Sequence, residues 1–192
     1  RRIMSVTEAP VRERILDAAT RRYYAEGIRA VSADRLIAEA GVSKVTFYRY
    51  FPSKEDLVVA YLEQQSAREK ESVAAQRTKH ANEPAAVLRW YADTVGGLSC
   101  APGFRGCPFI NAAAELSEVD HPGRKVVSDH RAWLTSQAAE LLTEMGIDNA
   151  DARADQLMML RDGAMVAGYL GGDPSAVAAS LKAAGRAVIG PR

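Results

Sequence analysis

Apolar residues recur at helical spacing along almost the whole chain, and no segment shows the strict alternation of a half-buried β-strand. The first apolar stripe comprises Ile15, Leu16, Ala18, Ala19 and Tyr23, and it ends before Gly27. Later stripes begin after capping residues and end at glycine or proline, as the ends of helices do. The pattern predicts about nine helices joined by short connections, so we expect an all-α fold.

The remaining helices are expected in order along the chain. They span Ser32–Ala40, Lys44–Tyr50, a long helix from Ser53 with Asp56 at the capping-box position, a helix from Asn82-Glu83-Pro84, Phe109–Leu116, Val126–Met145, Ala150–Leu170 and a last helix capped by Asp173-Pro174. A loop rich in glycine and proline connects Cys100 to Pro108, and the helix after it is expected to break before Pro122.

Two short helices near the N-terminus are typical of a helix-turn-helix. Gly41 supplies the bend after Ser32–Ala40, and Ser43 is placed to cap the second helix. Phe47 and Phe51 are four residues apart, so they share one face and can anchor this helix to a core. The residues left pointing outward are Lys44, Val45, Tyr48 and Arg49. Such a face suits DNA phosphates and base edges, as in a recognition helix.

A longer motif surrounds this helix pair. Ala38-Glu39-Ala40-Gly41-Val42-Ser43, then Thr46-Phe47-Tyr48, then Tyr50-Phe51-Pro52-Ser53-Lys54-Glu55-Asp56-Leu57 resembles the DNA-binding signature of the TetR family of transcriptional repressors. The resemblance covers Arg12 to Tyr61 and implies two domains. Residues 1–52 would form a three-helix DNA-binding domain, and residues 53–192 a helical effector-binding and dimerisation domain. Val45 departs from the pattern, because many members carry a small residue there, often glycine.

The resemblance and the helix geometry together assign DNA-binding roles. The candidate residues are Arg35, Ser43, Lys44, Val45, Thr46, Tyr48, Arg49 and Lys54. Lys44 and Arg49 are candidates for base edges or phosphate, and Thr46 and Tyr48 for phosphate. Val45 would contact a thymine methyl or set the helix angle. Lys54 would bind phosphate together with the amides that begin the long helix. An alternative stays open for Arg35 and Arg49, because each could be a solvated surface charge. Tyr50 is expected to pack and not to contact DNA.

Charge is unevenly distributed between the two expected domains. Residues 1–60 hold 11 Lys+Arg and 8 Asp+Glu, a balance of +3, and the remainder holds 14 and 16, a balance of −2. A mildly basic head on a mildly acidic body fits a protein that meets DNA with one part only. No apolar run is long enough to span a bilayer and no hydrophobic leader is visible, so we expect a cytoplasmic protein without a membrane partner.

Small residues are concentrated in the expected helix Ala150–Leu170, namely Gly163, Ala164, Ala167, Gly168 and Gly171. Close helix–helix approach is one reason for them, and the last two helices would then form a four-helix interface in a homodimer. The face involved would be Met159, Gly163, Val166 and Leu170. Packing within one subunit is the alternative. A dimer would present two recognition helices roughly 34–36 Å apart to a palindromic DNA operator.

The resemblance implies that the C-terminal domain binds a small-molecule effector that releases DNA. Aromatic residues, methionines and a few polar groups suit an apolar ligand pocket. The candidates are Trp90, Tyr91, Thr94, Phe104, Cys107, Phe109, Asn111, His130, Trp133, Gln137, Met158, Asp162, Met165 and Tyr169. The same residues also describe an ordinary core. If Asp162 is buried without an internal partner, the effector would be a cation.

The two cysteines, Cys100 and Cys107, flank the glycine- and proline-rich loop. With His121 and His130 they do not have a zinc spacing, and a disulfide is not expected in a reducing cytoplasm, so no metal or cofactor is predicted. Gly106-Cys107-Pro108-Phe109 resembles a motif of one TetR subgroup, some members of which sense electrophiles. A cysteine near a helix N-terminus can have a lowered pKa. The alternative is a buried, inert thiol.

Enzyme classes find no support in the sequence, because no Gly-x-Ser-x-Gly, P-loop, HExxH or paired-carboxylate arrangement is present. The favoured hypothesis is a ligand-responsive repressor that binds a palindromic operator as a dimer. A thiol-based repressor and a constitutive DNA-binding dimer without an effector are the alternatives. Repression and activation are not distinguished, because that depends on the position of the operator.

Overall fold

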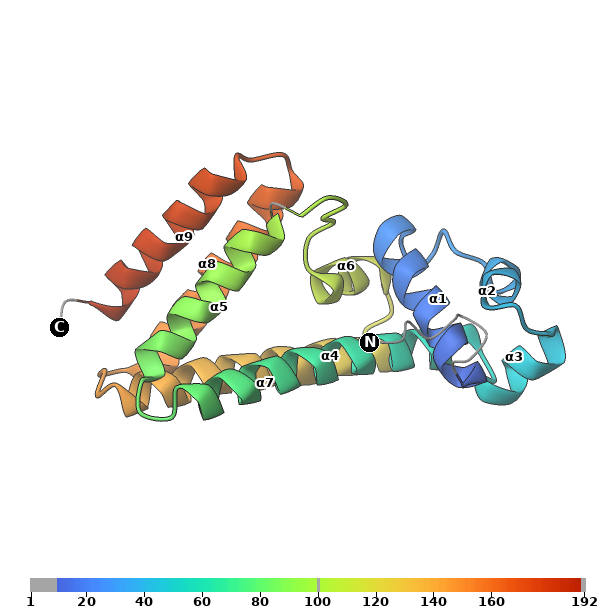
Figure 1. Cartoon of the computed structure of the whole chain (residues 1–192), viewed down its shortest axis with the longest axis horizontal. Helices are drawn as coiled ribbons and strands as arrows, with labels where there is room; N and C mark the ends of the chain where they lie inside the picture. Colours follow the sequence, from blue (N-terminus) through green and yellow to red (C-terminus); the bar gives the residue numbers. More distant parts are fainter. Residues whose placement is uncertain (1–9, 100, 191–192) are drawn as a thin grey trace, which may run out of the picture. The chain divides into compact units, whose positions relative to one another are not determined.

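The computed structural model describes residues 10–99 and 101–190, and over these ranges the chain folds into nine α-helices with no β-strand (Figure 1). The helices are α1 Val11–Glu26, α2 Ala33–Ala40, α3 Lys44–Tyr50, α4 Lys54–Lys79, α5 Pro84–Ser99, α6 Pro108–Glu115, α7 Pro122–Glu144, α8 Ala150–Tyr169 and α9 Pro174–Ile189. The predicted all-α fold is confirmed. None of the described helices is both long and apolar enough to cross a membrane.

The largest error in the predicted boundaries concerns α7. The helix begins at Pro122, four residues before the predicted start at Val126. Proline was interpreted as a break, but it is well suited to the first turn of a helix, where its missing N–H has no intrahelical partner to lose. The Pro84 and Pro174 starts of α5 and α9 follow the same rule and were predicted.

The helix-turn-helix has the predicted capping groups. The Ser32 hydroxyl accepts the backbone N–H of Arg35, and the Ser43 hydroxyl accepts that of Thr46 at 3.1 Å. Gly41 ends α2 in the left-handed region at φ 63°, where glycine is favoured. Phe47 is fully buried and Phe51 is nearly so, which anchors α3 as expected.

The described residues form two compact units that interleave in sequence. The first contains the chain up to Gln65 together with Pro108–Val127, and the second contains Ser66–Cys107 together with the chain from Ser128. The first unit therefore contains α1, α2, α3 and the start of α4, together with α6 and the start of α7. The predicted division after residue 52 separates the expected DNA-binding helices, whereas packing also assigns α6 to that unit.

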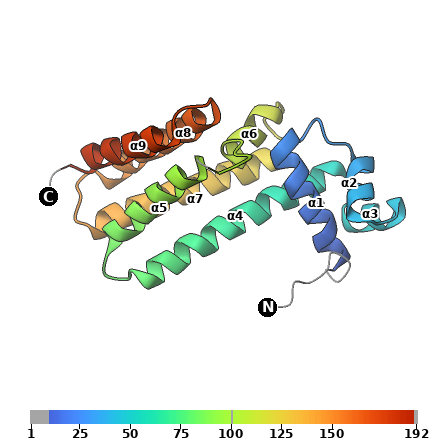
Figure 2. The same cartoon turned by 45° about the horizontal axis from the view of Figure 1, so that its top comes forward.

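In the second unit, α5, α8 and α9 pack against one another, as both views show (Figures 1 and 2). α5 and α9 approach each other closely at Gly96, where an added Cβ would lie 2.6 Å from the Cβ of Ala178. The parts of α4 and α7 that belong to this unit run parallel to each other. Ser66 on α4 contacts His130 on α7, and further along both helices Arg77 pairs with Glu144.

Candidate nucleic-acid interface and ligand cavity

The outer face of α3 carries the side chains predicted to meet DNA. Val45 is 81% exposed and Tyr48 is 38% exposed, and Lys44 and Arg49 are exposed beside them. Because Phe47 is buried on the opposite side, the helix can present this face without losing its anchor. An apolar side chain as exposed as Val45 gains nothing in water, which is consistent with either of its predicted roles.

The partners of these side chains are weak or local. Lys44 lies 3.8 Å from the carboxylate of Asp34, with both side chains largely exposed. The Arg49 guanidinium lies 5.2 Å from the ring centroid of Tyr50. Tyr50 is 38% exposed and its ring lies against Arg49, so the expectation that it packs and does not contact DNA stays a prediction. Exposed ion pairs contribute about 0–1 kcal/mol, so a phosphate can replace them at little cost.

Ser43 and Thr46 are occupied with each other. The Ser43 hydroxyl donates to Thr46 Oγ1 at 2.8 Å while it accepts the Thr46 backbone N–H. These bonds hold the start of α3, so Ser43 shapes the recognition helix whether or not it also meets DNA.

Arg35 is held more firmly than a free surface cation. Its guanidinium donates two bonds to Glu26, at 2.8 and 3.1 Å, and Glu26 also accepts from Arg22. The hydrogen bond from Arg35, followed by that from Arg22, lowers the pKa of Glu26. Arg21 and Arg22 continue the network to Glu39 on α2. A DNA contact by Arg35 would therefore compete with its ion pair to Glu26.

Lys54 begins α4 beside a completed capping box. The Ser53 hydroxyl accepts the Asp56 backbone N–H at 3.0 Å, and the Asp56 carboxylate accepts the Ser53 backbone N–H at 2.9 Å. Burial lowers the pKa of Lys54, and the nearby carboxylate of Glu115 opposes that shift. Lys54, the predicted phosphate contact, therefore lies between the capping box that begins α4 and the carboxylate of Glu115.

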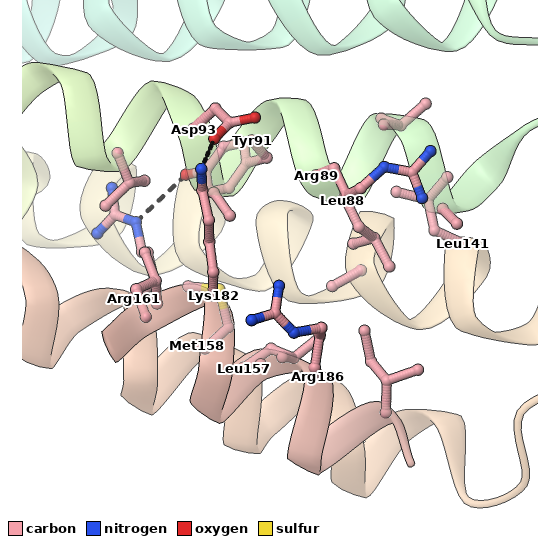
Figure 3. Close-up of a pocket in the computed structure, with 18 of the residues that line it drawn as sticks. Leu88, Arg89, Tyr91, Asp93, Leu141, Leu157, Met158, Arg161, Lys182 and Arg186 are labelled. Atoms are coloured by element: carbon pink, nitrogen blue, oxygen red, sulfur yellow. Dashed lines mark hydrogen bonds and ion pairs between the residues drawn. The ribbon is translucent and has the colours of Figure 1, made fainter. Parts of the chain in front are cut away.

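The second unit contains a cavity of about 800 Å³, partly open to solvent, among α4, α5, α7, α8 and α9 (Figure 3). Its apolar wall includes Val73, Val87, Leu134, Leu141, Leu157 and Met158. The α7 face toward it is Leu134, Gln137, Ala138, Leu141 and Met145, which is a helical stripe. The volume lies within the usual range of small-molecule sites, about 300–1,000 Å³.

Of the candidate ligand-binding residues, Tyr91, Gln137 and Met158 line this cavity, and their binding role stays a prediction. The other candidates lie outside its lining, and these are Trp90, Thr94, Phe104, Cys107, Phe109, Asn111, His130, Trp133, Asp162, Met165 and Tyr169. Phe109 and Asn111 belong to α6 in the first unit, and Tyr169 is exposed with the Arg105 guanidinium 5.4 Å from its ring centroid. Asp162 pairs with Arg131 and Arg161, so the condition for a cationic effector is not met.

His130 is buried in a polar cluster instead of the cavity wall. Its Nδ1 lies 2.9 Å from the Ser66 hydroxyl, and its Nε2 lies 3.1 Å from Glu69 Oε2. Glu69 also accepts the Tyr91 hydroxyl at 2.6 Å. Burial would raise the pKa of Glu69, but the hydrogen bonds from His130 and Tyr91 outweigh it and hold that pKa below its usual value. Polar residues of this kind pack inward because they satisfy one another.

Arg161 connects this cluster to the cavity and to Cys107. Its Nε donates to the Tyr91 hydroxyl at 3.2 Å, a bond drawn in Figure 3. Both terminal nitrogens donate to Cys107 Sγ at 3.4 Å, and the thiol is only 3% exposed. Cys100 lies outside the described residues. No group of three or more metal-ligating side chains occurs among the residues that the structure describes.

Sequence reasoning missed the charged part of the cavity wall. Arg89 and Asp93 on α5 and Lys182 and Arg186 on α9 all line it. Each pair is four residues apart and so shares one helix face. That spacing was a usable signal, but it was not combined with the pairing of α5 and α9.

The predicted dimer face of α8 is open to solvent in the single chain. Met159 is 68% exposed, Val166 43% and Leu170 76%. Between them, a Cβ added at Gly163 would meet no atom within 4 Å. Three exposed apolar side chains around an open glycine form an apolar surface that another helix can approach closely.

The head, formed by α1 to α3, carries a capped helix-turn-helix with an exposed face on α3. These features define the class of helix-turn-helix DNA-binding proteins. Residues 15–61 match the family model of the bacterial regulatory proteins of the tetR family. The crystal structure of SCO4454, a TetR-family transcriptional regulator from Streptomyces coelicolor, is 40% identical, with a TM-score of 0.87 over 93% of this chain and 94% of that chain. The chain therefore belongs to the TetR family and is a DNA-binding transcriptional regulator.

More distant relatives agree with this assignment. The HTH-type transcriptional regulator LmrA of Bacillus subtilis is 25% identical over 144 residues, or 74% of this chain and 76% of LmrA. The regulatory protein TetR from Rhodobacter sphaeroides, at 21% identity, shares the fold with a TM-score of 0.81 over 93% of this chain and 98% of that chain.

Proposed function

We propose that this regulator is a ligand-responsive repressor that binds a palindromic operator as a homodimer and is released from it by a small molecule in the cavity of the second unit. The cavity is the observation that carries the proposal. A wall of aliphatic side chains around about 800 Å³ has the size and the apolar character of a small-molecule site.

One helix supports coupling between ligand and DNA. α4 runs without interruption from Lys54, a predicted phosphate contact, to beyond Val73, which lines the cavity. A ligand regulates DNA binding only if it binds two conformations with different affinity. A helix shared by both sites provides a physical route for that difference.

The open α8 face supports the homodimer. α3 has only 7 residues, so one recognition helix contacts few base pairs. A second copy related by a two-fold axis would double the contacts. The exposed residues on α8 supply an apolar surface for that second copy. The proposed division of labour keeps residues 1–52 for DNA and residues 53–192 for effector binding and dimerisation.

Two alternatives remain with weaker support. A constitutive DNA-binding dimer has no use for the cavity. A thiol-based repressor would act through Cys107, whose sulfur is buried against Arg161. A Cys107→Ser variant that keeps its response to the effector would separate the ligand-responsive mechanism from the thiol-based one.

The test uses operator DNA selected from a random double-stranded library, with binding followed by fluorescence anisotropy against a panel of small molecules. Ala138→Trp places an indole in the cavity, and Ala132→Trp, on an exposed position of the same helix, is the matched control. We expect at least one compound to release DNA from the wild type and from the control but not from Ala138→Trp. Equal responses of the two variants would contradict the proposal.

A further inference from the structure

The register of α5 against α9 places one arginine on each helix in the turn beyond an ion pair. The two helices are antiparallel, because Gly96 meets Ala178 and, one turn along, Asp93 pairs with Lys182. The next turn carries Arg89 on α5 and Arg186 on α9. One helical turn therefore holds an ion pair between α5 and α9, and the next turn holds a cation on each helix.

The other charged groups of the cavity already have partners. Lys182 pairs with Asp93, and Arg161 donates to Asp162 at 3.1 Å. Among the residues that the structure describes, neither Arg89 nor Arg186 has a side-chain hydrogen bond or a carboxylate partner. In Figure 3 Arg186 reaches from α9 into the space between α9 and α5. Both guanidinium groups therefore keep their N–H donors available for an anion at the cavity wall.

The remainder of the wall favours an apolar molecule. Leu134, Leu141, Leu157 and Met158 line its inner part, whereas Arg89 and Arg186 are exposed at its edge. This separates an apolar interior from a cationic mouth. A ligand that satisfies both regions has an anionic group at one end and a hydrocarbon body at the other.

Resting on the ligand-responsive function proposed above, we propose that the effector is an amphipathic organic anion whose charged end binds Arg89 and Arg186 and whose apolar body fills the cavity. Guanidinium groups match planar carboxylates with two parallel hydrogen bonds, so a carboxylate is the headgroup that fits best. An aliphatic acid and an aromatic acid share this chemistry, and the measurement distinguishes them by affinity.

The probes are three molecules with the same twelve-carbon chain, namely dodecanoate, dodecanol and dodecyltrimethylammonium, together with 1-naphthoate as an aromatic acid. Binding to the full-length protein is measured by isothermal titration calorimetry, and operator release by anisotropy. We expect saturable binding of dodecanoate, about tenfold or more tighter than that of the uncharged or cationic chains. The affinity of 1-naphthoate against that of dodecanoate tells which body fits.

The variants are Arg89→Gln, Arg186→Gln and Lys182→Gln. All three remove one positive charge from the cavity wall, but Lys182 is already paired with Asp93, so it controls for the general field. Removing a charge-assisted contact is expected to weaken dodecanoate binding about tenfold to a hundredfold in each arginine variant, and less in Lys182→Gln. Unchanged operator affinity in each variant shows that the fold is intact.

The outcomes separate the two proposals. If dodecanol or dodecyltrimethylammonium binds as well as the acids and releases operator, the anion inference is overturned and the ligand-responsive function stands. Equal losses in all three variants would also overturn the assignment of the headgroup site. If no chain and no aromatic acid binds, the anion inference is overturned, and the compound panel with Ala138→Trp and Ala132→Trp decides the effector cavity separately.

Discussion

The carboxylate of Glu115 accepts the backbone N–H of Arg29 at 2.8 Å, which joins the end of α6 to the turn after α1. Its oxygens occupy the space beside Gly27, where an added Cβ would lie 3.0 Å from Oε1. Gly27 has φ 95°, so it is required both for its backbone conformation and for the approach of this carboxylate. The first unit is therefore held together by a contact between residues that lie far apart in the sequence, Arg29 and Glu115.

Gly27→Ala should destabilise the protein by about 1–3 kcal/mol, because it adds strain at positive φ to a collision with Glu115. Thermal unfolding followed by circular dichroism measures this, and a loss of each 1 kcal/mol lowers Tm by about 2–4 °C at this size. Gly103→Ala is the control, since Gly103 has φ 78° with nothing within 4 Å of an added Cβ. Equal effects of the two substitutions would refute the role of the Glu115 contact.

Lys44→Ala and Arg49→Ala should each weaken operator binding and reduce the slope of log K against log salt by about one, because each removes a cation from the exposed face of α3. The control is Lys79→Ala at the far end of α4, which removes the same charge from the second unit. Anisotropy titrations at several salt concentrations give the slopes. An unchanged slope in both α3 variants would exclude phosphate contacts by these residues.

Glu26→Gln should strengthen operator binding about twofold to fivefold if Arg35 meets DNA, because it weakens the ion pair that competes with that contact. The effect should vanish in the Arg35→Ala background, where there is no arginine to release. The double-mutant cycle is measured by anisotropy at one salt concentration. An increase that persists without Arg35 would place the effect elsewhere in the Arg21–Arg22–Glu39 network.

Glu69 predicts a pH dependence of stability. Its pKa is lower in the folded protein than its ordinary value of 4.5, so ionised Glu69 stabilises the fold above that pH. This contribution is lost as pH falls through the lowered pKa. The stability difference between wild type and Glu69→Gln, measured by urea unfolding, should therefore be largest near neutral pH and shrink below about pH 4.5. Glu71→Gln, at an exposed position of the same helix, serves as the control. A difference that stays constant with pH would contradict this role of Glu69.

Val166→Glu should convert the proposed dimer to monomers, because it places a charge in the centre of an apolar face without a partner for it. Sedimentation velocity measures the change, and Ala152→Glu at the exposed start of α8 is the control. A wild-type monomer, or a Val166→Glu variant that still forms dimers, would rule out this face as the interface.

The head was predictable because its signals are local. Ser43 as a cap and the pair Phe47 and Phe51 each act within one turn of α3, so they do not depend on the rest of the fold. The start of α7 was missed because proline both ends and begins helices. Local sequence does not choose between those two roles.

The cavity was predictable only in part. His130 and Leu134 lie one turn apart on α7, yet His130 faces Ser66 and Glu69 while Leu134 lines the cavity. A helix buried on several sides has no single apolar stripe, so its pattern does not tell which neighbour each residue meets. That Arg89 and Arg186 both line the cavity depends on the register of α5 against α9, which is a tertiary property.

The central claim is that cavity occupancy and operator binding are coupled, and thermodynamic reciprocity tests it most directly. The measurement is the affinity of one cavity-bound compound, by isothermal titration calorimetry, for the free protein and for the protein saturated with operator. We expect weaker binding of the compound to the operator complex, by the same factor by which the compound weakens operator binding. Equal affinities for the free and DNA-bound protein would contradict it.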